Sequence, residues 1–158
     1  MVIYCDTREQ NNRHIIDYFD KKGINHKIKK LDYGDYSFMI PKNENLGIPH
    51  DLDFSKRIMI ERKGSLDEFA SNLTRERDRF KKEMALAPET KIIMIENNTY
   101  SDLIHGNYRS NYHAMSYWAS YHSIWHEFHC PIIFMPNPSE SGLFIRGYFL
   151  YYLHNYLK

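Results

Sequence analysis

Two acidic residues and a lysine stand where the sequence predicts the ends of strands. Ile58-Met59-Ile60 is a short apolar run typical of a buried strand, and it continues into Glu61-Arg62-Lys63. Gly34-Asp35 comes directly before a second predicted strand. Because side chains alternate along a strand, Glu61 and Lys63 should point to one face and Arg62 to the other. Carboxylates from two strand ends, with an ammonium beside them, suit a divalent cation and water attack on a phosphodiester.

Two further acids are candidate ligands of the same cation. Asp6 and Glu9 follow the predicted strand Val2–Cys5. Strand ends that meet at one edge of an α/β sheet are where such proteins build their sites. We therefore expect Asp35 and Glu61 to bind one Mg²⁺ or Mn²⁺ through oxygen, with Asp6 and Glu9 as the next candidates.

Three basic residues near these acids are candidates for contact with a phosphodiester. Lys63 would orient or deprotonate the attacking water, or stabilise charge on the phosphorus. Arg8 and Arg62 would bind phosphate oxygens in a bidentate manner.

A basic segment follows, although the net charge of the chain is only +1. Nine lysines and arginines lie between Lys56 and Lys82. Arg79 and Glu83 are spaced to pair on one helix face, which is the simpler interpretation of Arg79. Arg79, Lys81 and Lys82 are nevertheless the candidate contacts to substrate phosphates in this segment.

Asp67 has two interpretations. It lies inside Ser65-Leu66-Asp67-Glu68, a capping-box pattern that predicts the start of a helix. Its charge would favour the positive end of that helix, or it would tether Arg62 or Lys63. We expect the tether.

The bulk properties predict one folded domain over residues 1–158. Hydrophobic residues make up 42% and charged residues 26% of the 158 residues, an ordinary globular balance. The two cysteines are far apart and indicate free buried thiols. No signal peptide or membrane span is visible in the sequence, so we expect a cytoplasmic protein with no membrane partner.

The order of predicted elements is strand, helix, several strands, then alternating helices and strands. This order predicts a three-layer α/β/α domain around a central mixed sheet. Residues 41–55 are expected to form a polar loop or extended hairpin, and 97–107 a loop. A later helix is expected to present one apolar stripe, formed by Met115, Trp118, His122, Trp125 and His129.

Taken together, these motifs resemble a known family. Gly34-Asp35, then Glu61-Arg62-Lys63 with Asp67 four residues later, is similar to the GD…ERKxxxD signature of XPF-type structure-specific endonucleases. These enzymes belong to the restriction-endonuclease-like PD-(D/E)XK superfamily. The opening Asp6-Thr7-Arg8-Glu9 resembles the D-x-R-E segment of that family. The 41–55 insertion makes the gap between Asp35 and Glu61 longer than is usual there.

The resemblance implies metal-dependent incision of branched or flapped DNA, as in recombination and replication intermediates. It also implies a dimer, for which the aromatic C-terminal helix with Phe144, Tyr148, Tyr151 and Tyr152 is the candidate surface. The chain looks like the stand-alone nuclease domains of bacteria and their phages. Two alternatives remain: a restriction-like or repair nuclease of the same superfamily, and a catalytically silent DNA-binding partner subunit.

Overall fold

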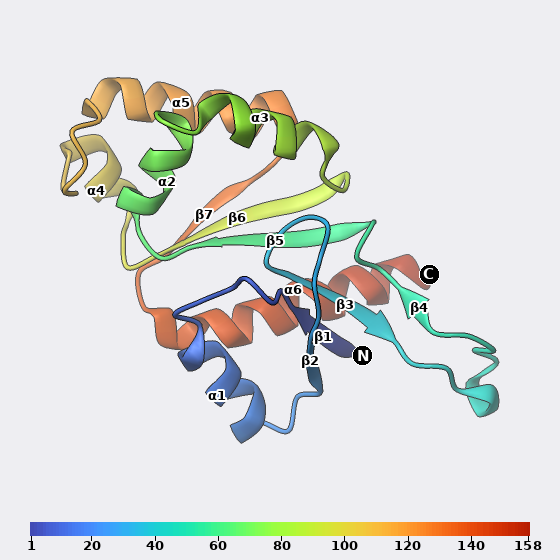
Figure 1. The fold of residues 1–158 in the computed structure, drawn as a ribbon. Coiled ribbons are helices and arrows are strands. Elements are labelled where there is room, and N and C mark those ends of the chain that lie inside the picture. Colours follow the sequence, from blue (N-terminus) through green and yellow to red (C-terminus); the bar gives the residue numbers. More distant parts are fainter.

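A seven-stranded mixed sheet forms the centre of the computed structural model, which describes residues 1–158 (Figure 1). The sheet order is β2-β1-β3-β5-β6-β7, and β4 pairs with β3. Strands β5, β6 and β7 are parallel, whereas β3 is antiparallel to both β1 and β5. The strands are β1 Val2–Cys5, β2 His26–Ile28, β3 Tyr36–Ile40, β4 Leu52–Asp53, β5 Ile58–Lys63, β6 Thr90–Glu96 and β7 Ile132–Met135.

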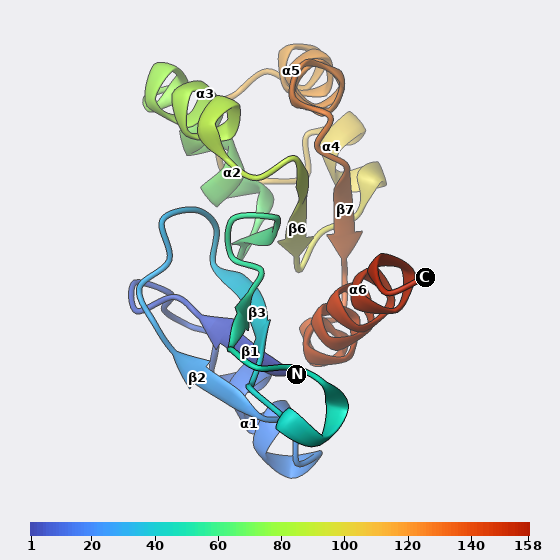
Figure 2. The same ribbon diagram turned by 90° about the vertical axis from the view of Figure 1, so that its right-hand side faces the viewer.

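Helices cover both faces of the sheet, as Figures 1 and 2 show. On one face lie α2 (Leu66–Leu73), α3 (Arg77–Leu86), α4 (Tyr100–His105) and α5 (Ala114–Phe128), and on the other lie α1 (Arg13–Lys21) and α6 (Ser141–Tyr156). Each face has its own apolar core. The predicted three-layer α/β/α architecture is therefore confirmed. None of the helices is long and apolar enough to cross a membrane.

Strand β5 alternates between the two cores as its sequence predicts. Met59 packs into the core under α2, α3 and α5, whereas Ile58 and Ile60 pack into the core under α1 and α6. The alternation continues into the charged end of the strand, so Arg62 faces the α1 and α6 layer. Glu61 and Lys63 thus lie on one side of the sheet and Arg62 on the other.

The 41–55 segment is an extended hairpin with structure of its own. It contains a 3-10 helix at Glu44–Leu46 and the short strand β4, and Phe54 returns it to the core. The ring of Phe54 stacks on Phe38 at 4.6 Å between centroids, against the aromatic end of α6. The insertion is anchored at its base and exposed at its tip.

Two sequence-based expectations, one for residues 97–107 and one for α5, differ from the structure. Residues 97–107 contain helix α4, which begins at a capping box formed by Thr99 and Asp102. The apolar stripe predicted for α5 lies only partly against the core, since Met115 is 61% and Trp118 39% exposed while Trp125 packs against it. The buried face of α5 consists of Tyr117, Ser120, Tyr121 and Ile124. Their spacing of three and four places them on one side of the helix, where the tyrosines pack against the sheet.

Candidate active site

Asp35 is held in place by a glycine that no other residue could replace without strain. Gly34 has φ +74°, and a Cβ built on it would lie 2.7 Å from the sulfur of Met59. The close approach lets the amide of Asp35 donate to the Ile60 carbonyl at 2.8 Å. The carboxylate of Asp35 then accepts a 2.7 Å hydrogen bond from the amide of Arg62. Asp35 is therefore fixed against the end of β5, as the GD pattern predicts.

Glu61 and Lys63 lie side by side on that strand end. The ammonium of Lys63 is 3.1 Å from Glu61 Oε1, and the lysine is only 6% exposed. Asp35 and Glu61 together line two adjoining cavities, of about 200 Å³ and about 350 Å³. The structure thus brings the two first-choice acids and the lysine to one place, which faces open space.

Burial and neighbouring charges shift the pKa values of Asp35, Glu61 and Lys63 in the metal-free protein. Burial raises the pKa of Asp35 well above its usual value, and the charge of Glu61 raises it further. Burial also raises the pKa of Glu61, although Lys63 acts against this. Burial would lower the pKa of Lys63, but the charges of Glu61 and Asp35 outweigh it, so the net shift is upward. The two carboxylates therefore favour the ammonium form of Lys63 in the metal-free protein.

Arg62 touches the larger of the two cavities, but its guanidinium is bound by the protein itself, which conflicts with its expected role as a phosphate clamp. Its guanidinium is 6% exposed and forms ion pairs with Glu9 at 2.8 Å and with Glu96. It also donates to the carbonyl of Gln10 at 2.6 Å. Arg62 is thus a buried tether between the β1–α1 loop and the end of β6.

Glu96 is the residue that sequence reasoning missed. Its carboxylate is 1% exposed and accepts hydrogen bonds from Arg62, His14 and Ser141. It therefore joins β5, β6, α1 and α6 directly behind the candidate site. The available signal was an acid at the end of the strongly apolar run Lys91–Ile95, the same kind of signal that singled out Glu61.

Asp6 and Glu9 lie beside the site, but their oxygens are already engaged. Both oxygens of Glu9 accept from Arg62. The carboxylate of Asp6 accepts from the Arg8 guanidinium at 2.9 Å and from the amide of Leu31 at 2.7 Å. These bonds hold the loops that frame the site, and a role for either acid as a metal ligand stays a prediction.

The candidate phosphate contacts divide into those near the acids and those remote from them. Arg8 is exposed and lines both cavities that contain Asp35 and Glu61. Arg79 and Glu83 pair at 3.1 Å, as their spacing predicts, and both line the smaller cavity. Lys81 pairs with Glu127 of α5 at 3.0 Å, whereas Lys82 is exposed and has no carboxylate partner.

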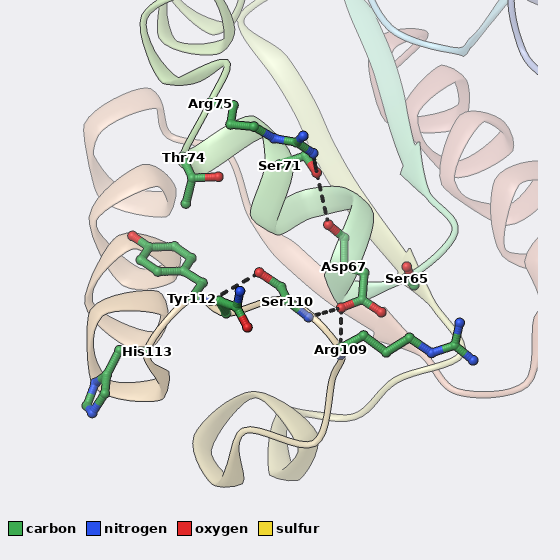
Figure 3. A pocket seen from close by; sticks show the side chains of 10 residues that line it. Ser65, Asp67, Ser71, Thr74, Arg75, Arg109, Ser110, Tyr112 and His113 are labelled. Carbon is green, nitrogen blue, oxygen red and sulfur yellow. Dashed lines mark hydrogen bonds between the residues drawn. The ribbon is translucent and has the colours of Figure 1, made fainter.

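Asp67 does not tether Arg62 or Lys63, so the preferred interpretation of this residue was wrong. One of its carboxylate oxygens accepts hydrogen bonds from the amides of Arg109 and Ser110, at 2.8 and 2.7 Å (Figure 3). Ser65 caps α2 by accepting from the amide of Glu68. Asp67 therefore joins the first turn of α2 to the loop between α4 and α5, a connection across 42 residues of sequence.

The donor set fits a hard divalent cation that keeps much of its water. No group of three or more His, Cys, Asp or Glu side chains is arranged to hold a metal ion. Asp35 and Glu61 are two adjacent carboxylates whose mutual repulsion a cation would relieve. Mg²⁺ is commonly bound through one or two carboxylates with water in the other positions. The residues present therefore fit a magnesium-type ion through these two side chains.

Comparison with known proteins places this geometry in a family. The model of the ERCC4 domain matches residues 5–148, which include every strand end described above. The chain belongs to the ERCC4 domain family. No curated protein matches it.

Solved structures show that this ERCC4 domain shares its fold with XPF from Aeropyrum pernix. XPF from Aeropyrum pernix is similar with a TM-score of 0.65 and 22% identity, over 93% of this chain and 59% of that one. The same protein in complex with DNA gives a TM-score of 0.70 and 21% identity, over 98% of this chain and 66% of that one. This ERCC4 domain thus spans less than two thirds of the proteins that it resembles.

Proposed function

We propose that this ERCC4 domain is a metal-dependent endonuclease that hydrolyses phosphodiester bonds in DNA. One observation carries the proposal: Asp35 and Glu61 line the same two cavities at the end of β5, and the buried Lys63 contacts Glu61. Buried like charges are costly, and a protein that keeps two of them beside each other in a cleft has a use for them. Family membership supports a nuclease over other metal enzymes.

Asp35 and Glu61 would hold the ion, which is Mg²⁺ or Mn²⁺ in this proposal. Such an ion supplies Lewis-acid polarisation of a phosphoryl oxygen and a more acidic water when it is bound. The hydrogen bond from the amide of Arg62 fixes one oxygen of Asp35, and the other oxygen would remain available to the ion. The rigid backbone contact therefore orients the carboxylate before any ligand arrives.

Lys63 acts in this scheme as an ammonium. The charges of Glu61 and Asp35 raise its pKa, and its 3.1 Å contact with Glu61 holds it beside that carboxylate. A fixed cation there stabilises negative charge that builds up on the phosphate oxygens as water attacks.

Arg8 is the proposed clamp on the phosphate next to the cleavage site. Its guanidinium is held by Asp6 yet remains exposed, and it lines both cavities beside Asp35 and Glu61. An arginine held by one carboxylate still has donors to offer to a phosphate oxygen. Arg79 is proposed to reach the same cleft by leaving Glu83, since an exposed pair of this kind is weak.

Branched DNA is the proposed substrate, as in recombination or replication intermediates. Support comes from the family and from the similarity to an XPF structure described as a complex with DNA. A restriction-like preference for linear duplex is the second candidate. The complete set of Asp35, Glu61 and Lys63 speaks against a silent partner subunit, because such a subunit has no need of these groups.

A homodimer through α6 is also proposed. Its outer face carries exposed apolar side chains, including Leu143, Leu150 and Tyr151. A shallow groove of about 430 Å³ runs along it, lined mostly by tyrosines. Apolar surface gathered on one helix is typical of an association surface.

The test is cleavage of a labelled panel containing linear duplex, flap, fork and four-way junction, with Mg²⁺ and with Mn²⁺. We expect cutting of the branched members and its loss with a chelator. Glu61→Gln should lower the rate by at least about 100-fold, the scale of a lost group that stabilises transition-state charge. Unchanged cutting by Glu61→Gln removes the catalytic assignment, and a preference for linear duplex favours the restriction-like candidate.

A further inference from the structure

A second, larger cavity lies beside the candidate active site. Its volume is about 930 Å³, and nine of its ten lining residues are polar or charged. Ser65, two residues beyond Lys63, forms part of its wall. It shares no lining residue with the cavities around Asp35 and Glu61. The cavity is therefore separate from the cleavage site, although Ser65 in its wall lies only two residues from Lys63.

Two unpaired arginines flank this cavity. Arg75 lies near the end of α2 and Arg109 near its start, on opposite sides in Figure 3. Neither takes part in any ion pair of the chain. The one hydrogen bond of Arg75 runs to the Ser71 hydroxyl at 3.3 Å. Both guanidiniums thus keep most of their donors for an anion.

The only carboxylate in the wall is already neutralised in part. Asp67 accepts from the amides of Arg109 and Ser110, so it fixes the loop that carries Arg109. The loop is held further by the Tyr108 hydroxyl, which donates to the carbonyl of Tyr112 at 2.6 Å. A cavity built on such a fixed loop loses little conformational entropy when a ligand binds.

Two helix starts border the same space, although the first turn of α2 also carries the acids Asp67 and Glu68. α2 begins at its cap Ser65 and α5 at its cap His113, and both caps line the cavity. The start of a helix carries partial positive charge on its free amides. Arginines, hydroxyls and helix starts together form a wall suited to phosphate.

We infer that this cavity binds backbone phosphates of the DNA strand as it leaves the cleavage site. The inference rests on the proposed nuclease function and adds to it a second place of contact. α2 has eight residues and so extends for about 12 Å. At about 3.4 Å per nucleotide along a duplex, that length corresponds to three or four nucleotides. The ligand is the sugar-phosphate backbone, which is bound without regard to base.

The experiment compares two double variants of equal charge. Arg75→Gln/Arg109→Gln removes the flanking cations, and Lys21→Gln/Lys22→Gln removes two exposed charges at the end of α1, in the opposite layer. Binding of forked DNA is measured without divalent metal over a range of salt. The slope of log affinity against log salt should become shallower by about two for the arginine variant. The lysine variant should keep the wild-type slope.

The outcomes separate this inference from the proposed function. Equal slopes for the two variants, while the wild-type protein binds and cuts, overturn the inference alone. A wild-type protein that neither binds nor cuts any DNA overturns both. In a second arm, the amide NMR signals of Ser110 and Asn111 should shift with an oligonucleotide but not with the same concentration of inorganic phosphate. Equal shifts with both ligands, or none with either, also overturn it.

Discussion

Arg62 and Glu96 form an almost completely buried ion pair that joins two neighbouring strands directly behind the candidate site. Each end of this pair has other partners: Glu9 and Gln10 bind Arg62, and His14 and Ser141 bind Glu96. The β1–α1 loop, which frames the cleft, is therefore held from beneath the sheet. Removal of either partner would leave the other buried charge with only part of its compensation.

Glu96→Ala should lower the free energy of unfolding by about 3–5 kcal/mol, since Arg62 would remain charged and buried. Chemical denaturation followed by circular dichroism measures this. The control is Asp17→Ala, which breaks the exposed Arg13–Asp17 pair and should change the free energy by less than about 1 kcal/mol. Similar losses for the two variants would contradict the role given to the buried pair.

Glu96 should also make the protein sensitive to acid. Burial by itself would raise the pKa of Glu96, but hydrogen bonds from Ser141, His14 and Arg62 bring it below 4.5. A carboxyl with a lowered pKa in the folded state contributes stability above pH 4.5, and the contribution is lost as pH falls through the lower value. Urea midpoints measured from about pH 6 to about pH 3 should fall more for wild type than for Glu96→Gln.

In the metal-free protein, the effect of Asp35 on the change of stability with pH should have the opposite sign. Burial and the charge of Glu61 raise its pKa, so the folded state binds a proton more readily than the unfolded chain. Metal-free stability should therefore fall as pH rises from 3.8 through the raised value. Asp35→Asn should remove this penalty, stabilise the metal-free protein near neutral pH and abolish cleavage. A less stable Asp35→Asn protein, by urea unfolding in chelator, would contradict this.

Gly34→Ala should disturb the site through the backbone. The methyl group would lie within 3 Å of the Met59 side chain, and alanine disfavours φ +74°. We expect a loss of about 1–3 kcal/mol and a fall in cleavage larger than the loss of stability explains. Gly23→Ala is the control, because Gly23 has a similar φ of +63° but open space around it. Only the loss of stability should appear there, measured by thermal unfolding beside single-turnover cleavage.

The two lysines of α3 should differ in their effect on DNA binding. Lys81 is engaged by Glu127, whereas Lys82 is exposed without a carboxylate partner. Lys82→Ala should weaken binding on every DNA form alike and flatten the salt dependence by about one unit. Lys81→Ala should have the smaller effect. Salt titrations on duplex and fork check both, and unchanged slopes for both would show that α3 faces away from DNA.

The sequence predicted the strand ends well because alternation along β5 depends on local pattern alone. Met59, Glu61 and Lys63 share a face for the same reason that Ile58, Ile60 and Arg62 share the other. The same pattern does not reveal which distant residues each of these side chains contacts. Arg62 meets Glu9 across 53 residues and Glu96 across 34, and both contacts depend on how the β1–α1 loop packs on the sheet. Arg62 was therefore expected to bind substrate, whereas its guanidinium is buried and pairs with Glu9 and Glu96.

Asp67 and α5 show the same limit in helices. The capping box correctly predicted the start of α2, but the loop amides that Asp67 binds lie 42 and 43 residues later. In α5 two faces carry large side chains, and the sequence analysis identified only the stripe of tryptophan and methionine. The tyrosines are buried because their hydroxyls reach carbonyl partners, as Tyr117 does with Leu66 and Tyr121 with Ile132.

The stacking of Phe54 on Phe38 gives the 41–55 insertion a rigid footing, while the apex at Glu44–Leu46 projects into solvent. A fluorophore or affinity handle attached at Asn45 would thus move with the body of the protein without touching its catalytic cleft. Such a label offers a fixed reference from which the path of a bound oligonucleotide could be traced by energy transfer.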